Sequence, residues 1–143
     1  MTDCILDASV AAKWLLPPAG EALVPEAAQL LQDYGDGRLS IVVPDLFWLE
    51  VGNLLRTSVR RGRISLSSAD EALREIEQRD FPTFPSRPLL KHAFAIATAF
   101  DRTVYDSVYV ALAITSRFPL ITADERLANA LAARAPVRWL GAL

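Results

Sequence analysis

Short apolar runs alternate with helix-like segments along this chain, and this alternation constrains the fold more than any other feature. Residues 3–7 read as a buried strand because the run is short, apolar and followed by a helix start. Residues 41–43, 120–122 and 137–140 have the same apolar character. Strands separated by helices favour an α/β sandwich around a largely parallel sheet, and the excess of helix favours a small sheet of four or five strands.

Helices are predicted where proline, glycine and capping residues bound the longer segments. The predicted helices cover residues 9–15, 21–34, 44–61, 67–79, 88–100, 105–117 and 124–133. Pro44 opens the third of these and Gly62 ends it. Ser67 and Asp70 form a capping arrangement for the fourth. Residues 80–88 are read as an extended connection that could hold a short strand.

The length and composition indicate one globular domain over residues 1–143. Hydrophobic residues make up 52% of the chain and charged residues 22%, which is enough apolar material for a substantial core. The formal charge of −2 argues against a general nucleic-acid coat protein but not against a nuclease. The single cysteine, Cys4, excludes an internal disulfide and a multi-cysteine zinc site. No signal peptide or membrane span is evident, so we expect a cytoplasmic protein with no membrane association.

Four acidic residues stand inside apolar stretches, namely Asp7, Glu50, Asp106 and Asp124. Carboxylates are rare beside core residues unless they are paired or bound to a cation. Sites in open parallel sheets form beyond the carboxyl ends of the strands, and Asp7 and Asp124 each follow a predicted strand. Asp106 lies at a helix start, and Glu50 lies nearly two turns into its helix, from which it can lean over the same edge. The pattern therefore predicts one shared anionic site, suited to hard divalent cations.

Three of these acids have a structural alternative. Asp106 follows Thr103 at the spacing of a capping box, and Asp124 also stands at a helix start. Asp7 precedes the first helix, which it could cap. Glu50 has no such role because it lies inside a helix. The conjunction of all four acids is what favours the functional interpretation.

Polar and basic side chains accompany Glu50 along its helix. By their spacing, Asn53, Thr57 and Arg60 share its helical face, which is either an exposed polar stripe or the lining of a cleft. The end of this helix and the turn after it carry a basic cluster of Arg56, Arg60, Arg61 and Arg63. This cluster is either merely solvated or contacts phosphate or an acidic partner. Lys13 is read as a surface lysine, with balancing the acids or touching a phosphate as the alternative.

Other enzyme signatures are missing from the sequence. His92, the only histidine, lies between apolar positions of a predicted helix and is read as a packing or surface residue, which disfavours a Ser-His-Asp triad. Glycine-rich phosphate-binding motifs are absent from the sequence. Trp14, Trp48 and Trp139 have apolar neighbours and are most simply core residues.

Four segments resemble the motifs of PIN-domain ribonucleases, particularly the toxin components of bacterial VapBC toxin–antitoxin pairs. These segments are 5–10, 44–55, 105–113 and 120–127, and they occur in the order found in that family. The resemblance implies a three-layer α/β/α sandwich with a mostly parallel sheet, and an endoribonuclease dependent on Mg²⁺ or Mn²⁺. Carried over by position, the catalytic and metal-binding residues are Asp7, Glu50, Asp106 and Asp124, with Ser9, Asn53 and Thr122 as secondary polar residues.

The implied chemistry is hydrolysis of RNA phosphodiester bonds without a histidine base. Asp7 and Asp106 are the expected nearest metal ligands, whereas Glu50 and Asp124 are expected to act through water or a second ion. The resemblance also implies a cognate antitoxin as partner and a homodimer. Two alternatives stay open: a DNA or RNA-processing nuclease outside a toxin–antitoxin pair, and a non-catalytic PIN module that binds a partner.

Overall fold

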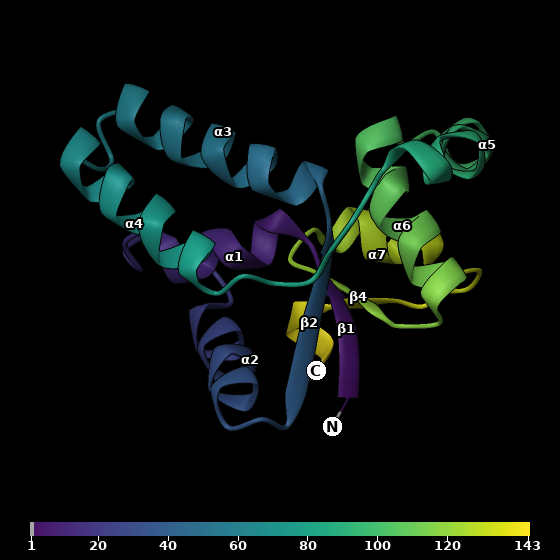
Figure 1. The fold of residues 1–143 in the computed structure, drawn as a ribbon, viewed down its shortest axis with the longest axis horizontal. Coiled ribbons are helices and arrows are strands. Elements are labelled where there is room, and N and C mark those ends of the chain that lie inside the picture. Colours follow the sequence, from purple (N-terminus) through teal and green to yellow (C-terminus); the bar gives the residue numbers. More distant parts are fainter. Residues whose placement is uncertain (1) are drawn as a thin grey trace.

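A parallel sheet lies between two layers of helices (Figure 1). The strands are β1 (Thr2–Leu6), β2 (Leu39–Pro44), β3 (Thr83–Phe84), β4 (Leu120–Thr122) and β5 (Val137–Trp139). The computed structural model describes residues 2–143, and in this range the sheet has five strands in the order β3-β2-β1-β4-β5. Each neighbouring pair is parallel, which confirms the predicted sheet of four or five strands. The short strand within 80–88 is also confirmed.

The helices form the two outer layers. They are α1 (Ala8–Leu15), α2 (Val24–Gly35), α3 (Leu46–Arg60), α4 (Leu66–Gln78), α5 (Leu90–Phe100), α6 (Val104–Ser116) and α7 (Glu125–Leu131), with short 3-10 turns η1 (Arg87–Leu89) and η2 (Leu140–Ala142). In Figure 1, α1 to α4 lie to one side of the strands and α5 to α7 to the other. This arrangement confirms the α/β/α sandwich. From β1 the chain crosses first to β2 and later returns to β4 on the opposite side, so the strand order reverses between β1 and β4.

The core lies on both faces of the central strands. Residues Cys4 to Leu6 of β1 are fully buried, as expected for a central parallel strand covered by helices on both sides. Helix α6 is buried without interruption from Ser107 to Ala113, which explains why this segment is apolar around its whole circumference. Trp14, Trp48 and Trp139 are partly buried and pack against the core, and His92 is exposed on α5.

Pro44 ends β2, and the prediction that it opens α3 was wrong. The flanking N–H groups of Val43 and Asp45 donate to carbonyls on the β3 side at 3.0 and 2.8 Å. Because N–H groups of a strand alternate in direction, the donor that Pro44 lacks would have pointed towards β1. The register between β1 and β2 ends at Val42, so the missing donor costs no ladder hydrogen bond.

Two predicted helix starts also differ from the structure. Ser65 caps α4, with its hydroxyl accepting a hydrogen bond from the Ser68 N–H at 3.0 Å, whereas Ser67 already lies inside the helix. Helix α2 begins at Val24 rather than at residue 21, because Pro25 occupies its first turn, where a missing N–H has no consequence. Glu21 is thereby left outside the helix. Within the described range, none of the helices is long and apolar enough to cross a membrane.

Candidate functional site

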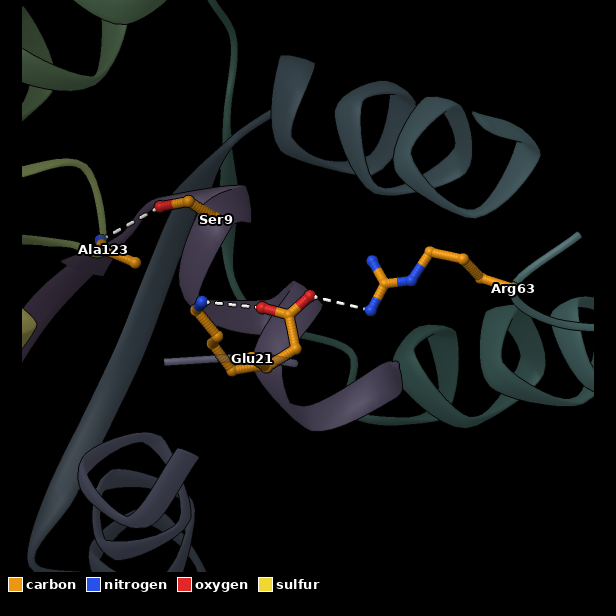
Figure 2. A network of polar contacts seen from close by, with 5 residues as sticks. Ser9, Glu21, Arg63 and Ala123 are labelled. Atoms are coloured by element: carbon orange, nitrogen blue, oxygen red, sulfur yellow. Dashed lines mark hydrogen bonds and ion pairs between the residues drawn. The ribbon is translucent and has the colours of Figure 1, made fainter. Parts of the chain in front are cut away.

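Asp7 lies at the end of β1, next to the point where the strand order reverses. Its side chain is buried, and its Oδ2 accepts hydrogen bonds from the hydroxyl groups of Thr122 at 2.7 Å and Ser9 at 2.9 Å. The Ser9 Oγ in turn accepts the Ala123 N–H at 3.1 Å (Figure 2), and the Thr122 Oγ1 accepts the Asp124 N–H at 3.0 Å. These bonds join the end of β1 to the end of β4 and fix the orientation of the Asp7 carboxylate without using its Oδ1.

The environment of Asp7 opposes its ionisation. Burial raises the pKa of Asp7, and the negative charge of Asp106 adds to this effect. The hydrogen bonds from Thr122 and Ser9 lower the same pKa because they stabilise the charged form. The two hydroxyl groups therefore help to keep a buried carboxylate ionised.

Glu50 leans into this region from the second turn of α3. Its pKa is raised from 4.5 to about 7, mainly by burial and also by the charges of Asp7 and Asp106. Its Oε1 atom is buried and finds no hydrogen-bond partner among residues 2–143. The same is true of the Tyr109 hydroxyl. The Tyr109 hydroxyl lowers the pKa of Glu50, although the two side chains do not meet the geometric criteria of a hydrogen bond.

Asp106 lies in the first turn of α6 but is not the residue that caps it. The Thr103 hydroxyl caps the helix by accepting the Asp106 N–H at 3.0 Å, as the capping interpretation of this segment predicted. The Asp106 carboxylate is half-buried. Burial raises its pKa, and the charge of Asp124 adds to the increase. Asp106 thus interacts electrostatically with the other three acids.

Asp124 has a structural role that the sequence alternative anticipated. Its Oδ1 accepts the N–H groups of Arg126 at 3.0 Å and Leu127 at 3.2 Å, so it caps α7. Its side chain is exposed, and it influences the pKa of Asp106. The fold therefore groups Asp7, Glu50 and Asp106, with Asp124 at the exposed side of the group.

The acids form a loose rather than a closed arrangement. Within the part of the chain that the structure describes, no three Asp, Glu, His or Cys side chains make a ready-made metal-binding group. The donor set still suits a hard cation. Mg²⁺ is usually held by one or two carboxylates and retains several waters, and the unpartnered Oε1 of Glu50 offers it a buried anionic oxygen. Uncompensated burial of such an atom is costly, and a bound cation would relieve that cost.

The remaining predicted residues lie around this group. Asn53 is exposed on α3, and its side chain forms no hydrogen bond with the acids among the described residues. Lys13 is neither a surface lysine nor a counter-charge of the acids: its side chain is 16% exposed, and its Nζ donates to Glu21 at 2.8 Å. The basic cluster divides, because Arg61 and Arg63 face a cleft beside Ser9, while Arg56 borders a different groove, between α3 and α4.

Two residues of this region escaped the sequence analysis. Tyr109 follows Asp106 by three residues, so helical spacing alone could have placed its hydroxyl on the same face. Glu21 gave no such signal because its partner Arg63 is 42 positions away. The volume of a cavity is also no guide to the position of the acidic site. The apolar groove between α3 and α4 has a volume of about 450 Å³, but the acids do not line it.

Comparison with known proteins identifies the relatives of this chain. Residues 4–131 match the PIN domain family. The chain is 31% identical over 131 residues to ribonuclease VapC1 of Mycobacterium tuberculosis, a match that spans 91% of this chain and 92% of that protein. Its fold is similar to the crystal structure of PAE2754 from Pyrobaculum aerophilum, with a TM-score of 0.70, 22% identity, and coverage of 99% of this chain and 85% of the other. A toxin-antitoxin complex from Klebsiella pneumoniae aligns with a TM-score of 0.59, 17% identity, and coverage of 94% and 95%.

Proposed function

This chain belongs to the PIN-domain family, and from that premise we propose that it is a metal-dependent endoribonuclease and the toxin of a toxin–antitoxin pair. The observation that supports this proposal is the group of buried and half-buried acids near the point where the strand order reverses. Asp7 is oriented there by two hydroxyl groups, and Glu50 presents a buried oxygen without a partner among residues 2–143. The relative named ribonuclease VapC1 supports RNA as the substrate.

The proposed site divides the four acids into two pairs with different roles. Asp7 and Asp106 are the nearest ligands of a Mg²⁺ or Mn²⁺ ion, and Glu50 and Asp124 act through water or a second ion. When bound, the ion would activate water and neutralise the scissile phosphate. Ser9 and Thr122 hold the Asp7 carboxylate in place. The pKa values of Asp7, Glu50 and Asp106 are raised because burial and mutual repulsion destabilise their ionised forms. A bound cation would offset this repulsion once the acids are ionised.

The partners follow from the same premise. An antitoxin is supported by the structural likeness to a toxin–antitoxin complex, and a short neighbouring gene for a DNA-binding protein would support it further. A homodimer is supported by Leu90 and Phe94, whose large apolar side chains are 55% and 63% exposed on α5. We expect the protein to act as one domain in the cytoplasm, where RNA is available and the lone Cys4 meets a reducing environment.

Cleavage of total RNA and tRNA in the presence of Mg²⁺ or Mn²⁺ tests the proposal. Chelator should abolish cleavage, and Asp7→Asn and Asp106→Asn should each reduce it by more than about 100-fold, which is the upper range for losing an outer-shell partner of a metal. Asp101→Asn is the matched control: Asp101 is exposed and has a left-handed backbone (φ 52°) that asparagine tolerates.

Circular dichroism should show that all three variants keep the fold. Full cleavage by both site variants would refute the site. Metal-dependent cleavage of DNA in preference to RNA would instead favour the alternative nuclease, and binding of an antitoxin without any cleavage would favour a non-catalytic module.

A further inference from the structure

A cleft of about 340 Å³ leads away from the acidic site between α1 and α3. Ser9, Ala123 and Asp124 line the cleft at the end next to the acids. Lys13, Arg61 and Arg63 line it as well, and they give its other part a positive character. The cleft therefore joins a negative region, suited to a cation, to a positive region, suited to an anion.

Glu21 holds two of these cations in position. Its Oε2 accepts a hydrogen bond from Lys13 at 2.8 Å, and its Oε1 accepts one from Arg63 at 3.0 Å. Figure 2 shows Glu21 between Arg63 and the helix that carries Ser9, so the bridge spans the cleft wall from α1 to the turn after α3. The hydrogen bond from Lys13 lowers the pKa of Glu21, so the Glu21 carboxylate stays ionised at neutral pH.

The charges in this part of the cleft do not cancel. Lys13, Glu21 and Arg63 together carry one net positive charge, and Arg61 adds a second. Arg61 forms no ion pair with any residue from 2 to 143, so its charge is available to a ligand. The Lys13 side chain is 16% exposed, and partial burial strengthens its interaction with an anion.

We propose that this cleft binds the backbone of single-stranded RNA beyond the scissile bond, with Lys13, Arg61 and Arg63 holding a phosphate that flanks the one cleaved. This inference rests on the proposed function, because it takes the acidic end as the place of the scissile phosphate. A continuous polyanion fits both ends of the cleft at once, with one phosphate at the cation site and another at the basic residues. An acidic peptide fits less well, because Glu21 and Asp124 would repel its carboxylates.

Basic residues outside the cleft supply matched controls for this proposal. The test variants are Lys13→Gln and Arg61→Gln, and the controls are Arg56→Gln, on the α3–α4 groove, and Lys91→Gln, exposed on α5. Arg61→Gln leaves the Glu21 bridge intact, so its effect does not depend on a structural role of the bridge. Lys13→Arg keeps the charge and should restore binding.

Two measurements separate phosphate binding from a general loss of fold. The first is binding of a labelled single-stranded RNA, followed by fluorescence anisotropy as a function of salt, in an Asp7→Asn background that cannot cleave. Each test substitution should lower the slope of log K against log salt by up to about 0.7, the value for one phosphate contact on a single strand, because the three cations share that phosphate. The second is steady-state cleavage of a dinucleotide and of a longer RNA. KM for the longer RNA should rise several-fold with kcat unchanged, whereas cleavage of the dinucleotide, which lacks the flanking phosphate, should not change.

The outcomes distinguish this inference from the proposed function. If Asp7→Asn abolishes cleavage but Lys13→Gln and Arg61→Gln bind and cleave the longer RNA as the wild type does, the phosphate subsite is refuted and the nuclease stands. An equal loss on both substrates, or an equal loss in the two controls, also refutes the subsite. Weakened binding of an antitoxin by Lys13→Gln and Arg61→Gln with unchanged RNA binding would assign the cleft to a protein partner instead.

Discussion

Replacing Glu50 by glutamine should make the metal-free protein more stable at neutral and alkaline pH. Glu50 is half-buried, and its pKa rises from 4.5 to about 7 in the folded state, mainly through burial and also through the charges of Asp7 and Asp106. The folded protein therefore holds a proton on Glu50 over a pH range in which the unfolded chain has lost it. Stability contributed by this group is present below pH 4.5 and is lost as the pH rises to about 7.

The size of the effect follows from this difference in pKa. Each pH unit corresponds to about 1.4 kcal/mol, so a difference of about 2.5 between the two states sets an upper limit of about 3.4 kcal/mol. Solvent screens a half-exposed group, and a realistic penalty at pH 8 is about 1–2 kcal/mol. Glutamine removes this penalty because it does not ionise, and its amide could pair with the Tyr109 hydroxyl, which has no hydrogen-bond partner in residues 2–143.

Urea denaturation in chelator at pH 8 and at successively lower pH measures this difference. Glu50→Gln should unfold at higher urea than the wild type at pH 8, and the gap should close as the pH falls towards 4.5. Glu77→Gln, an exposed substitution on α4, is the control and should change stability by less than about 0.5 kcal/mol. Saturating Mg²⁺ should shrink the gap because it compensates the wild-type charge. A variant that is no more stable than the wild type at pH 8 would show that Glu50 does not belong to a strained group of acids.

Two further substitutions test local features. Thr122→Val removes the 2.7 Å hydrogen bond to Asp7 and leaves only Ser9 to stabilise the charged carboxylate, so the pKa of Asp7 rises. The acid limb of kcat/KM against pH should then move to higher pH, and an unchanged profile would contradict the orienting role of Thr122. Ser65→Ala removes the cap of α4 and should lower the free energy of unfolding by about 1 kcal/mol. Ser67→Ala is its control in thermal denaturation, since Ser67 lies inside the helix, and equal losses in the two variants would rule out the cap.

The sequence predicts most of the fold because its apolar patterns are local. The runs around Ile5 and Ile121 are short and bounded by helix starts, and both became central strands. Pro44 was misassigned because a proline is compatible with a helix start and with a strand end, and only the position of β1 and β3 decides between them. Ser65 and Ser67 are both good capping residues, and residue type alone does not show that Ser65 is the one that caps α4.

The sequence predicts which acids belong to the group, but it does not decide the capping role or the hydrogen bonds of each one. A strand end and a helix start indicated where Asp7 and Asp106 would lie, and the helix after the second strand indicated the place of Glu50. The mutual effects of these acids on pKa agree with that placement. Asp124 shows that a capping role and proximity to the acids can coexist, which spacing cannot reveal. The bridge from Lys13 to Glu21 depends on a loop whose path no periodic pattern describes.

The central place of β1 has a consequence for the synthesis of this protein. Its partner strands come from residues 39–44 and 120–122, and the hydroxyl group that orients Asp7 belongs to a residue 115 positions later. A nascent chain that has not yet emerged past Thr122 therefore lacks β4, which pairs with one edge of β1. It also lacks the Thr122 hydroxyl group that donates a hydrogen bond to Asp7. Contacts of such long sequence separation form late in folding. We therefore expect the acidic site to form only after β4 has joined the sheet, and a nascent chain without β4 to lack ribonuclease activity.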